Sequence, residues 1–569
     1  MTAPGPAPAA PPRRRAWRPL LILAAAVFLL HAAVTGGHLV SPDGELLCRQ
    51  AEAMALQGRI DVRPLEWHDE ARRLLVPPEM AFAVVQAPSG RFHPQYLPLQ
   101  PLLSVPILWA AEATRPLLGE AFARTLPGTP RHPVVDAHIA WRRGLLVMVF
   151  NPLVAALTAL VLARTVLVLT SDRRAALWVA GLWAFGTMAW PHSRTYFTEP
   201  LAGLLAMGAL ERLLRWRATP AGTEGPRRRL VLAMQFGAAL AAGMAARMDS
   251  PLIAIGFGAG MVLVGEHQRL HASARGEQPP SHLWRDYLAA GAVVVAGYLA
   301  ILLYNDYRFS GFSMLRGLDV AGLVTGGYAD QEEGVKFTTP LLVGLHGYLF
   351  SPGKGMFFFS PALLLGVWGW CKAPRSLRWV GWLLLVGFLP FTIAMVKWQN
   401  WDGGWCWGPR HILQLHAPIM LGAAFLFTGI EGWRPLRNGI IKGVAVAAVA
   451  VQLLGSSQSP MDFYDELYQS TADGHYFTAG YRPFEYPTVG RAFAVSLRED
   501  DGSAGPEVVP ALLPAPLVDS LYLPHHTQWS GNFWLWRLGY RDWLLWRVAT
   551  GQGFRGSIES LREDAEPAP

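Results

Sequence analysis

The most distinctive chemical pattern in the sequence is the segment KWQNWDGGWCWGPRH, residues 397–411, which lies between two apolar runs. Tryptophan faces are suited to stacking on sugar rings, and paired glycines let a backbone approach a ligand closely. Arg410 follows a proline at the start of the next apolar run, where its guanidinium could bind a phosphate bidentately. An aromatic belt at a membrane interface is the alternative. The candidate sugar-binding and acceptor-binding residues of this segment are Trp398, Trp401, Asp402, Gly403 and Gly404.

Three other cations stand beside apolar runs and are candidates to bind a donor phosphate. Lys354 lies in the glycine-rich turn LFSPGKGMFFFSP, where helix-start N–H groups and one lysine would form an anion site; a plain turn is the alternative. This turn lacks the GxxxxGK[ST] pattern of a nucleotide-binding loop. Arg308 in YNDYRFSGF is either a phosphate ligand or an interfacial anchor. Arg247 in ARMDSP is either a ligand or the ion-pair partner of Asp249.

Acidic residues at the ends of apolar runs are candidates for general-base chemistry. Asp43, in SPDGE, stands where the first apolar run ends, and Glu45 follows two residues later. A carboxylate in a half-dry cleft can take a proton from an acceptor hydroxyl. The alternative is a capping role, with Ser41 or Asp43 starting a helix expected over residues 44–56. Two further polar candidates for the sugar or acceptor site are Glu199 in SRTYFTEP and His93 in RFHPQYLP.

The composition places the elements that carry these residues in a membrane. Of 569 residues, 52% are hydrophobic and only 16% are charged, against about 25% charged in an average soluble protein. The net charge of +8 comes from arginine clusters between apolar runs. That pattern fits the positive-inside rule better than nucleic-acid binding. Three scattered cysteines predict neither a disulfide framework nor a cysteine metal site.

Apolar runs of about 20 residues predict an all-α polytopic protein with about 11 to 13 transmembrane helices. We expect residues 1–16 to be a disordered cytoplasmic N-terminus, followed by an uncleaved first helix and a membrane domain over 17–455. Two outer loops, 41–95 and 305–355, are long enough to hold chemistry. The extracytoplasmic C-terminal region, 456–569, ends in aromatic residues that suit either an interfacial helix or a small packed cap.

The ordered motifs together resemble a known family. The series consists of DG after the first helix, then SRxxxxE, RxD, YNxxRF, SPGKGxFxxSP and WDGGxxxGPR. It resembles bacterial members of the GT-C superfamily of membrane glycosyltransferases, the group related to protein O-mannosyltransferases and aminoarabinose transferases. The likeness covers about residues 17–430. It implies a GT-C-type helical bundle, a polyprenyl-phosphate sugar donor and a catalytic acid in the first outer loop.

Carried over residue by residue, the resemblance gives Asp43 the role of general base, with Glu45 as the nearest second acid. The residues expected to neutralise the leaving lipid phosphate are Lys354, Arg410, Arg308 and Arg247. The sequence departs from the family at RFHPQYLP, which has no second acidic residue. No cofactor is therefore assigned, and a carboxylate-bound divalent metal would need Glu45 or Glu199 as a substitute ligand.

The resulting hypothesis is an inverting hexosyl- or pentosyltransferase in the cytoplasmic membrane, with its active site facing outside. Its partners would be the bilayer, the lipid-linked donor and the hydroxyl of a glycan, lipid or protein acceptor, with no nucleic acid. One alternative is a ligase or polymerase of lipid-linked glycans, which could work without a base in the first loop. The other is a flippase, for which internal repeats and broken helices would be expected; the sequence pattern indicates neither.

Overall fold

The computed structural model describes the greater part of the chain. The described residues are 17–62, 84–123, 137–219, 225–277, 280, 282–312, 337–398, 401–404, 406–428, 435–458, 528–529, 532 and 542–550. The predicted N-terminal region 1–16, most of the C-terminal region 456–569 and the middle of both outer loops lie outside these residues.

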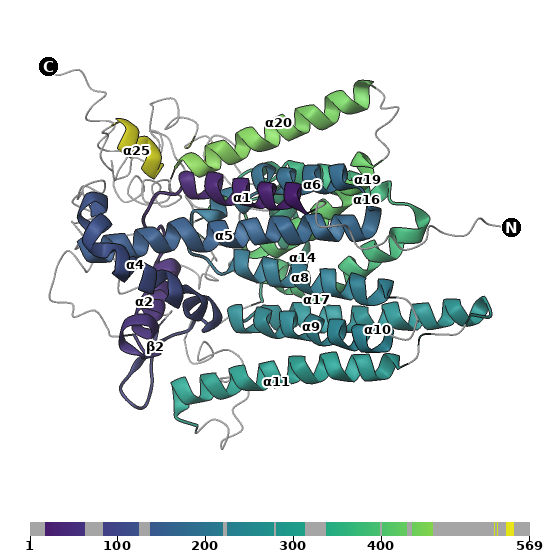
Figure 1. Cartoon of the computed structure of the whole chain (residues 1–569), viewed down its shortest axis with the longest axis horizontal. Coiled ribbons are helices and arrows are strands. Elements are labelled where there is room, and N and C mark those ends of the chain that lie inside the picture. Colours follow the sequence, from purple (N-terminus) through teal and green to yellow (C-terminus); the bar gives the residue numbers. More distant parts are fainter. Residues whose placement is uncertain are drawn as a thin grey trace, which may run out of the picture.

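Helices dominate the described part of the chain, and most of them run side by side along the long axis of the molecule (Figure 1). The predicted helical, polytopic fold class is therefore confirmed. The main helices are α1 (Arg18–Ala33), α2 (Pro42–Gln57), α4 (Leu99–Ala123), α5 (Ala137–Thr170), α6 (Arg173–Gly186), α8 (Glu199–Ala218), α9 (Gly225–Ala246), α10 (Ser250–Ala274), α11 (Leu283–Ser310), α14 (Leu341–Phe350), α16 (Ala362–Cys371), α17 (Arg378–Lys397) and α20 (Pro435–Ser457).

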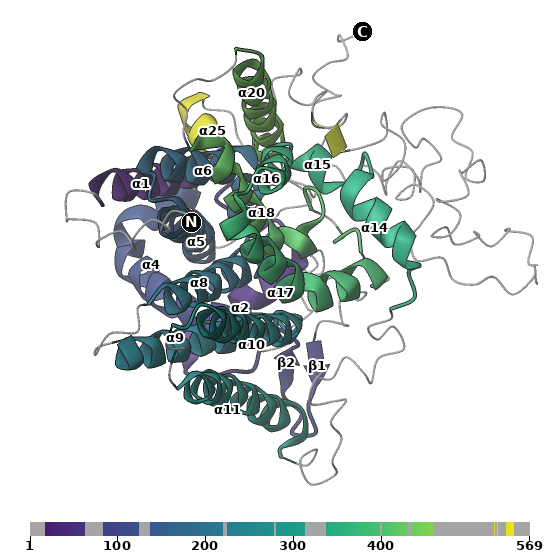
Figure 2. The same ribbon diagram turned by 90° about the vertical axis from the view of Figure 1, so that its right-hand side faces the viewer.

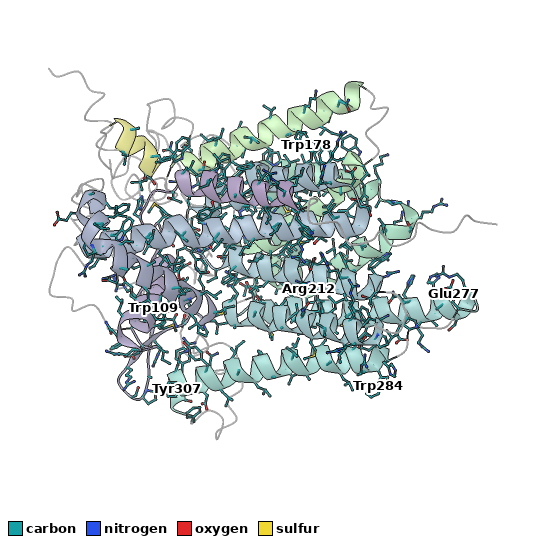
Figure 3. All side chains as sticks on the ribbon, in the orientation of Figure 1. Trp109, Trp178, Arg212, Glu277, Trp284 and Tyr307 are labelled. Atoms are coloured by element: carbon teal, nitrogen blue, oxygen red, sulfur yellow. The ribbon has the colours of Figure 1, made fainter. Side chains whose placement is uncertain are left out.

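Six helices in the described residues are long and apolar enough to cross a membrane. They are α5, α9, α10, α11, α17 and α20. Figure 3 shows Trp284 and Tyr307 near opposite ends of α11, where their side chains are 66% and 48% exposed. At 1.5 Å per residue these rings are about 35 Å apart along the helix, which suits the two interfaces of a bilayer. The exposed apolar surface between them is therefore suited to face lipid.

Glycines let neighbouring helices approach closely. A Cβ atom on Gly256 of α10 would lie 2.2 Å from the carbonyl oxygen of Gly387 on α17. A Cβ on Gly237 of α9 would lie 2.5 Å from the carbonyl oxygen of Ala290 on α11. Small residues at such crossings allow the backbone packing on which helix association in membranes depends.

Two apolar runs differ from the continuous helices expected of them. Residues 410–427 form a chain of short pieces: η5 (Arg410–Leu415), α18 (His416–Met420), η6 (Leu421–Ala423) and α19 (Ala424–Phe427). Pro409 ends the preceding loop and Pro418 removes a backbone donor inside the run, so a continuous α-helix is interrupted. The run at 356–371 is likewise divided, into α15 (Met356–Phe359) and α16. A hydropathy window does not detect such breaks because it averages over the whole segment, and both segments are apolar on average.

One end of the bundle carries α2 and a small hairpin, and we call it the α2 end (Figures 1 and 2). Strand β1 (Val84–Gln86) pairs antiparallel with β2 (Phe92–Pro94), with Val85 opposite His93. The helix predicted over residues 44–56 is confirmed as α2. Its cap is Ser41, whose hydroxyl accepts a hydrogen bond from Gly44 N at 3.1 Å. The carboxylate of Asp43 is therefore not needed as the cap.

Candidate active site

Arg410 is at the centre of a charged cluster at the α2 end. It begins η5, the helical piece that follows the WDGG segment. Its Nη1 lies 2.7 Å from Asp43 Oδ2, and its Nε lies 3.7 Å from Glu199 Oε1. The guanidinium also stacks over the Phe197 ring, 4.2 Å from its centroid. One arginine thus joins the N-terminal ends of three separate elements: α2, α8 and η5.

Asp43 has two well-defined partners. Besides Arg410, its Oδ1 accepts a hydrogen bond from the Tyr96 hydroxyl at 2.6 Å. The side chains of Asp43 and Arg410 remain 20% and 16% exposed, whereas Glu199 behind them is 3% exposed. The carboxylate is therefore held in a fixed position and is still reachable from outside the bundle.

The cluster continues inward from Glu199. Arg247 Nη1 lies 2.6 Å from Glu199 Oε1, and Arg247 Nη2 lies 2.6 Å from Asp249 Oδ2. Burial would lower the pKa of Arg247, but the two carboxylates outweigh it and raise that pKa, so the guanidinium stays charged. His411 Nδ1 stands 3.6 Å from the same Glu199 oxygen. We call Asp43, Arg410, Glu199, Arg247 and Asp249 the charge network.

Lys354 is fully buried and contacts the loop that precedes Arg410. Its Nζ donates to the carbonyl oxygens of Gly404 at 2.6 Å, Cys406 at 2.8 Å and Gly408 at 3.4 Å. Phosphate binding by this lysine stays a prediction; in the described residues its ammonium faces backbone carbonyls and the Cys406 thiol. The three carbonyl oxygens belong to the turn that precedes η5. We therefore expect Lys354 to stabilise the backbone that leads into η5.

The WDGG segment owes its shape to left-handed glycines. Gly403, Gly404 and Gly408 have φ values of +82°, +66° and +66°, which residues with a side chain rarely adopt. Asp402 Oδ2 accepts a hydrogen bond from Gly404 N at 2.9 Å, and the Asp402 side chain is buried. These residues shape the turn, and their role toward a sugar stays a prediction.

The two candidate sugar-stacking tryptophans lie in different surroundings. Trp401 is fully buried, edge-on to Tyr348 with ring centroids 5.7 Å apart, and packs against Gly347. Trp398 is half-buried, and its ring lies 4.5 Å from that of His411 beside the charge network. Of the two, only Trp398 is placed to offer part of a ring face to a ligand.

Arg308 is also turned toward the protein. Its Nη1 donates to the carbonyl oxygens of Pro94 at 2.6 Å and Tyr96 at 3.0 Å, and its Nη2 donates to Asn305 Oδ1 at 2.7 Å. Since its side chain is buried, we assign it to holding the segment after β2 against α11. That segment carries Tyr96, whose hydroxyl donates to Asp43.

Glu45 and His93 lie beside the charge network without belonging to it. Glu45 pairs with Arg49 and Arg143, each at 2.7 Å; burial opposes its charge, but these two arginines lower its pKa. His93 is buried, and burial together with nearby Arg308 lowers its pKa to about 4, so its ring is neutral at physiological pH. Both residues are thereby occupied in holding α2 and the hairpin in place.

Sequence reasoning did not find three members of this site. Tyr96 binds the proposed base, Phe197 underlies Arg410, and His411 faces Glu199. Tyr96 follows His93 in RFHPQYLP, and Phe197 precedes Glu199 in SRTYFTEP, so both stand inside motifs that were noticed for another residue. A phenol or a phenyl ring has no charge that would mark it as functional from spacing alone.

The described residues contain no group of three or more His, Cys, Asp and Glu side chains placed to hold a metal ion. Asp43 and Glu199, the two acids at the centre, both face Arg410. Glu45, the other proposed substitute ligand, is bound by Arg49 and Arg143. These acids of the described part of the chain, each paired with an arginine, do not fit a carboxylate-bound divalent metal.

Comparison with known proteins gives structural matches only. No family model matches the sequence, and no curated protein matches it. The solved structures to which the chain is similar include an archaeal oligosaccharyltransferase and a bacterial ArnT.

The first of these structures is the oligosaccharyltransferase AglB from Archaeoglobus fulgidus in complex with an inhibitory peptide and a dolichol-phosphate. It shows 14% identity and a TM-score of 0.43, and the match covers 83% of this chain and 61% of that one. The second is ArnT from Cupriavidus metallidurans bound to undecaprenyl phosphate, with 13% identity and a TM-score of 0.41, covering 81% of this chain and 72% of that one. This chain therefore spans less than two thirds of the archaeal protein.

Proposed function

We propose that this protein transfers a hexose or pentose from a polyprenyl-phosphate donor to an acceptor hydroxyl at the outer face of the cytoplasmic membrane, with inversion. The observation that carries the proposal is the placement of Asp43. A partly exposed carboxylate, fixed by Arg410 and Tyr96, sits beside a cation that a phosphate can reach. A base and an anion-binding group at one place are what sugar transfer from a lipid phosphate requires.

In the proposed reaction the acceptor oxygen attacks the anomeric carbon while its proton passes to the Asp43 carboxylate. A new carbon–oxygen bond forms as the bond from the anomeric carbon to the phosphate oxygen breaks. The polyprenyl phosphate leaves with the bonding electron pair. Attack from the side opposite the leaving group inverts the anomeric centre.

The Asp43–Arg410 ion pair couples the transfer of the acceptor's proton to the departure of the phosphate. Before the reaction Arg410 shares its charge between Asp43 and Glu199. When Asp43 takes the proton, its negative charge disappears, and the attraction of Arg410 to it falls. The guanidinium is then released toward the phosphate at the moment when negative charge develops there. Arg247 keeps Glu199 paired during this change.

The remaining expected residues have supporting places in this proposal. Lys354 shapes the turn before Arg410, and Arg308 holds the segment that carries Tyr96. Trp398, beside His411, is the half-buried ring for a sugar or acceptor to contact. The α2 end lies opposite the ends of α8 and α9 that carry Arg212, Arg215 and Arg228, which supports an outward-facing site under the positive-inside rule.

The test uses the full chain in lipid nanodiscs with radiolabelled polyprenyl-phosphate sugars and a membrane extract as acceptor. We expect transfer by the wild type, loss of transfer in Asp43→Asn and Arg410→Ala, and normal transfer in the exposed control Glu277→Gln. If the wild type consumes no donor, the proposed glycosyltransferase activity is refuted. Full transfer by Asp43→Asn would refute Asp43 as the base and favour a ligase that works without one. Movement of intact donor across the bilayer of sealed proteoliposomes would favour a flippase. Retention at the anomeric carbon would refute direct displacement.

A further inference from the structure

The C-terminal region returns to the α2 end of the bundle. Its helix α25 (Leu544–Thr550) lies beside the ends of α1 and α20 in both views (Figures 1 and 2). The backbone N–H of Leu544 donates to the carbonyl oxygen of Thr35, after α1, at 2.9 Å. The backbone N–H of Asp542 donates to the carbonyl oxygen of Ser457, at the end of α20, at 2.7 Å. The chain is therefore bound to the bundle directly before and at the start of α25.

Asp542 anchors this region through its side chain, which is fully buried. Arg194 Nη2 lies 3.0 Å from Asp542 Oδ2 and donates to the Asp542 carbonyl oxygen at 2.7 Å. His38 Nε2 lies 3.2 Å from the same carboxylate oxygen. Because an unpaired charge in the interior of a protein is costly, Arg194 and Asp542 each stabilise the other's burial. Asp542 thus ties the C-terminal region to the segment that carries Arg194.

That segment also contacts the WDGG turn. Arg194 follows the short helix α7 (Ala189–Ser193), and the buried His192 of α7 donates from Nε2 to the carbonyl oxygen of Trp407 at 2.9 Å. Trp407 precedes Arg410 by three residues in the same loop. A series of short polar contacts therefore leads from Asp542 through α7 to the backbone that presents Arg410.

A second contact from the C-terminal region reaches the same turn directly. The ring of Trp529 is stacked on that of Trp407, with centroids 6.5 Å apart and planes 20° apart, and is edge-on to Phe359 at 6.4 Å. Phe359 is itself edge-on to Trp407 at 4.8 Å, and a Cβ on Gly455 of α20 would overlap the Trp407 ring. These separations are those of favourable aromatic pairs. Trp407 is thus enclosed by α15, α20 and the C-terminal region.

We propose that the C-terminal region positions the WDGG turn, and through it Arg410, with Asp542 and Trp529 as positioning residues. Asp542 acts through Arg194 and α7, and Trp529 acts through the ring of Trp407. The turn contains glycines with positive φ, and glycine-rich backbone has the most conformational freedom to lose, so its position depends on contacts from other segments. The effect on sugar transfer rests on the proposed function, whereas the effect on the turn does not.

The positioning role is tested by hydrogen–deuterium exchange of the full chain in nanodiscs. Asp542→Asn removes the charge that pairs with Arg194, and Trp529→Leu removes the stacked ring. In both variants we expect the amides of residues 401–411 to exchange about tenfold faster or more, because exchange reports local opening. Trp529→Phe, which keeps a ring, should restore most of the protection. The matched control is Leu545→Ala, whose side chain in α25 is 58% exposed, and it should leave residues 401–411 unchanged.

Faster exchange confined to residues 542–550, with residues 401–411 as in the wild type, would overturn the positioning role. Equal losses of protection in Trp529→Leu and Trp529→Phe would overturn the stacking contact. If Asp542→Asn speeds exchange throughout the bundle, the comparison of the two Trp529 variants decides the question.

The same variants are then assayed for sugar transfer at saturating donor. We expect kcat to fall about tenfold or more in Asp542→Asn and Trp529→Leu, since small displacements of a reacting group are costly, and to be unchanged in Leu545→Ala. A wild-type kcat in a variant whose turn exchanges faster would overturn the link to transfer. Because exchange is read without turnover, failure of the positioning role is distinguishable from failure of the proposed function.

Discussion

Replacing Lys354 by methionine separates its observed role from the phosphate-binding role that the sequence suggested. Methionine keeps the length of the side chain and removes the ammonium. The substitution leaves the carbonyl oxygens of Gly404 and Cys406 without the donor that now lies 2.6 and 2.8 Å away. Both oxygens belong to a turn that contains glycines with positive φ. This fixed backbone leaves the two oxygens few other hydrogen-bond donors to accept from.

The expected cost follows from these contacts. Two buried acceptors at about 1–3 kcal/mol each give a gross loss of roughly 2–6 kcal/mol. Removing a buried ammonium from a low-dielectric site returns part of this, so we expect a net loss of about 2–4 kcal/mol. The loosened turn also displaces Arg410, and a misplacement of about 1 Å in a reacting group costs on the order of 100-fold in rate.

The assay is the free energy of unfolding in mixed micelles, followed by tryptophan fluorescence, together with the rate of sugar transfer. The matched control is Lys372→Met, an exposed lysine at the end of α16, which should change stability by less than about 0.5 kcal/mol. Unchanged stability in Lys354→Met, with weaker binding of the lipid-phosphate donor alone, would refute the structural reasoning. The lysine would then be a phosphate ligand.

Three further predictions test the site. Arg410→Lys keeps a charge but loses the planar guanidinium that reaches both Asp43 and Glu199. The initial rate of transfer at saturating donor should therefore fall about 100-fold or more. A loss under threefold would contradict the coupling role. Tyr96→Phe removes the 2.6 Å hydrogen bond to Asp43. A charge-assisted hydrogen bond of about 1.5–3 kcal/mol predicts a loss of roughly 10- to 100-fold in kcat, with an unchanged free energy of unfolding. A wild-type kcat would exclude Tyr96 from orienting the base. The folded-state pKa of His93, about 4, is below its unfolded value of 6.5, so the unfolded chain binds more protons between these values and stability falls as the pH is lowered through that window. His93→Gln should lose less stability than the wild type between pH 6.5 and 4, and equal losses would show that His93 does not titrate in this way.

The sequence by itself determined the features that depend on short stretches of chain. Apolar length predicts membrane helices such as α5 and α11, because a helix of about 20 apolar residues is the stable way to cross a bilayer. The start of α2 was predictable because Ser41, Pro42 and the following turn form a local capping pattern. The sequence also marked Asp43 and Arg410 as candidates, since both stand at the ends of apolar runs.

Only the tertiary structure decided which of these residues meet and what they bind. Asp43, Glu199 and Arg410 come from distant parts of the chain, and their contact depends on how α2, α8 and η5 pack. The roles of Lys354 and Arg308 were not visible because most of their partners in the described residues are backbone carbonyls. Every residue type has such a carbonyl, so no pattern of side chains records which ones lie within reach of a buried cation. Whether a charge faces a ligand or the protein's own backbone is therefore decided by packing.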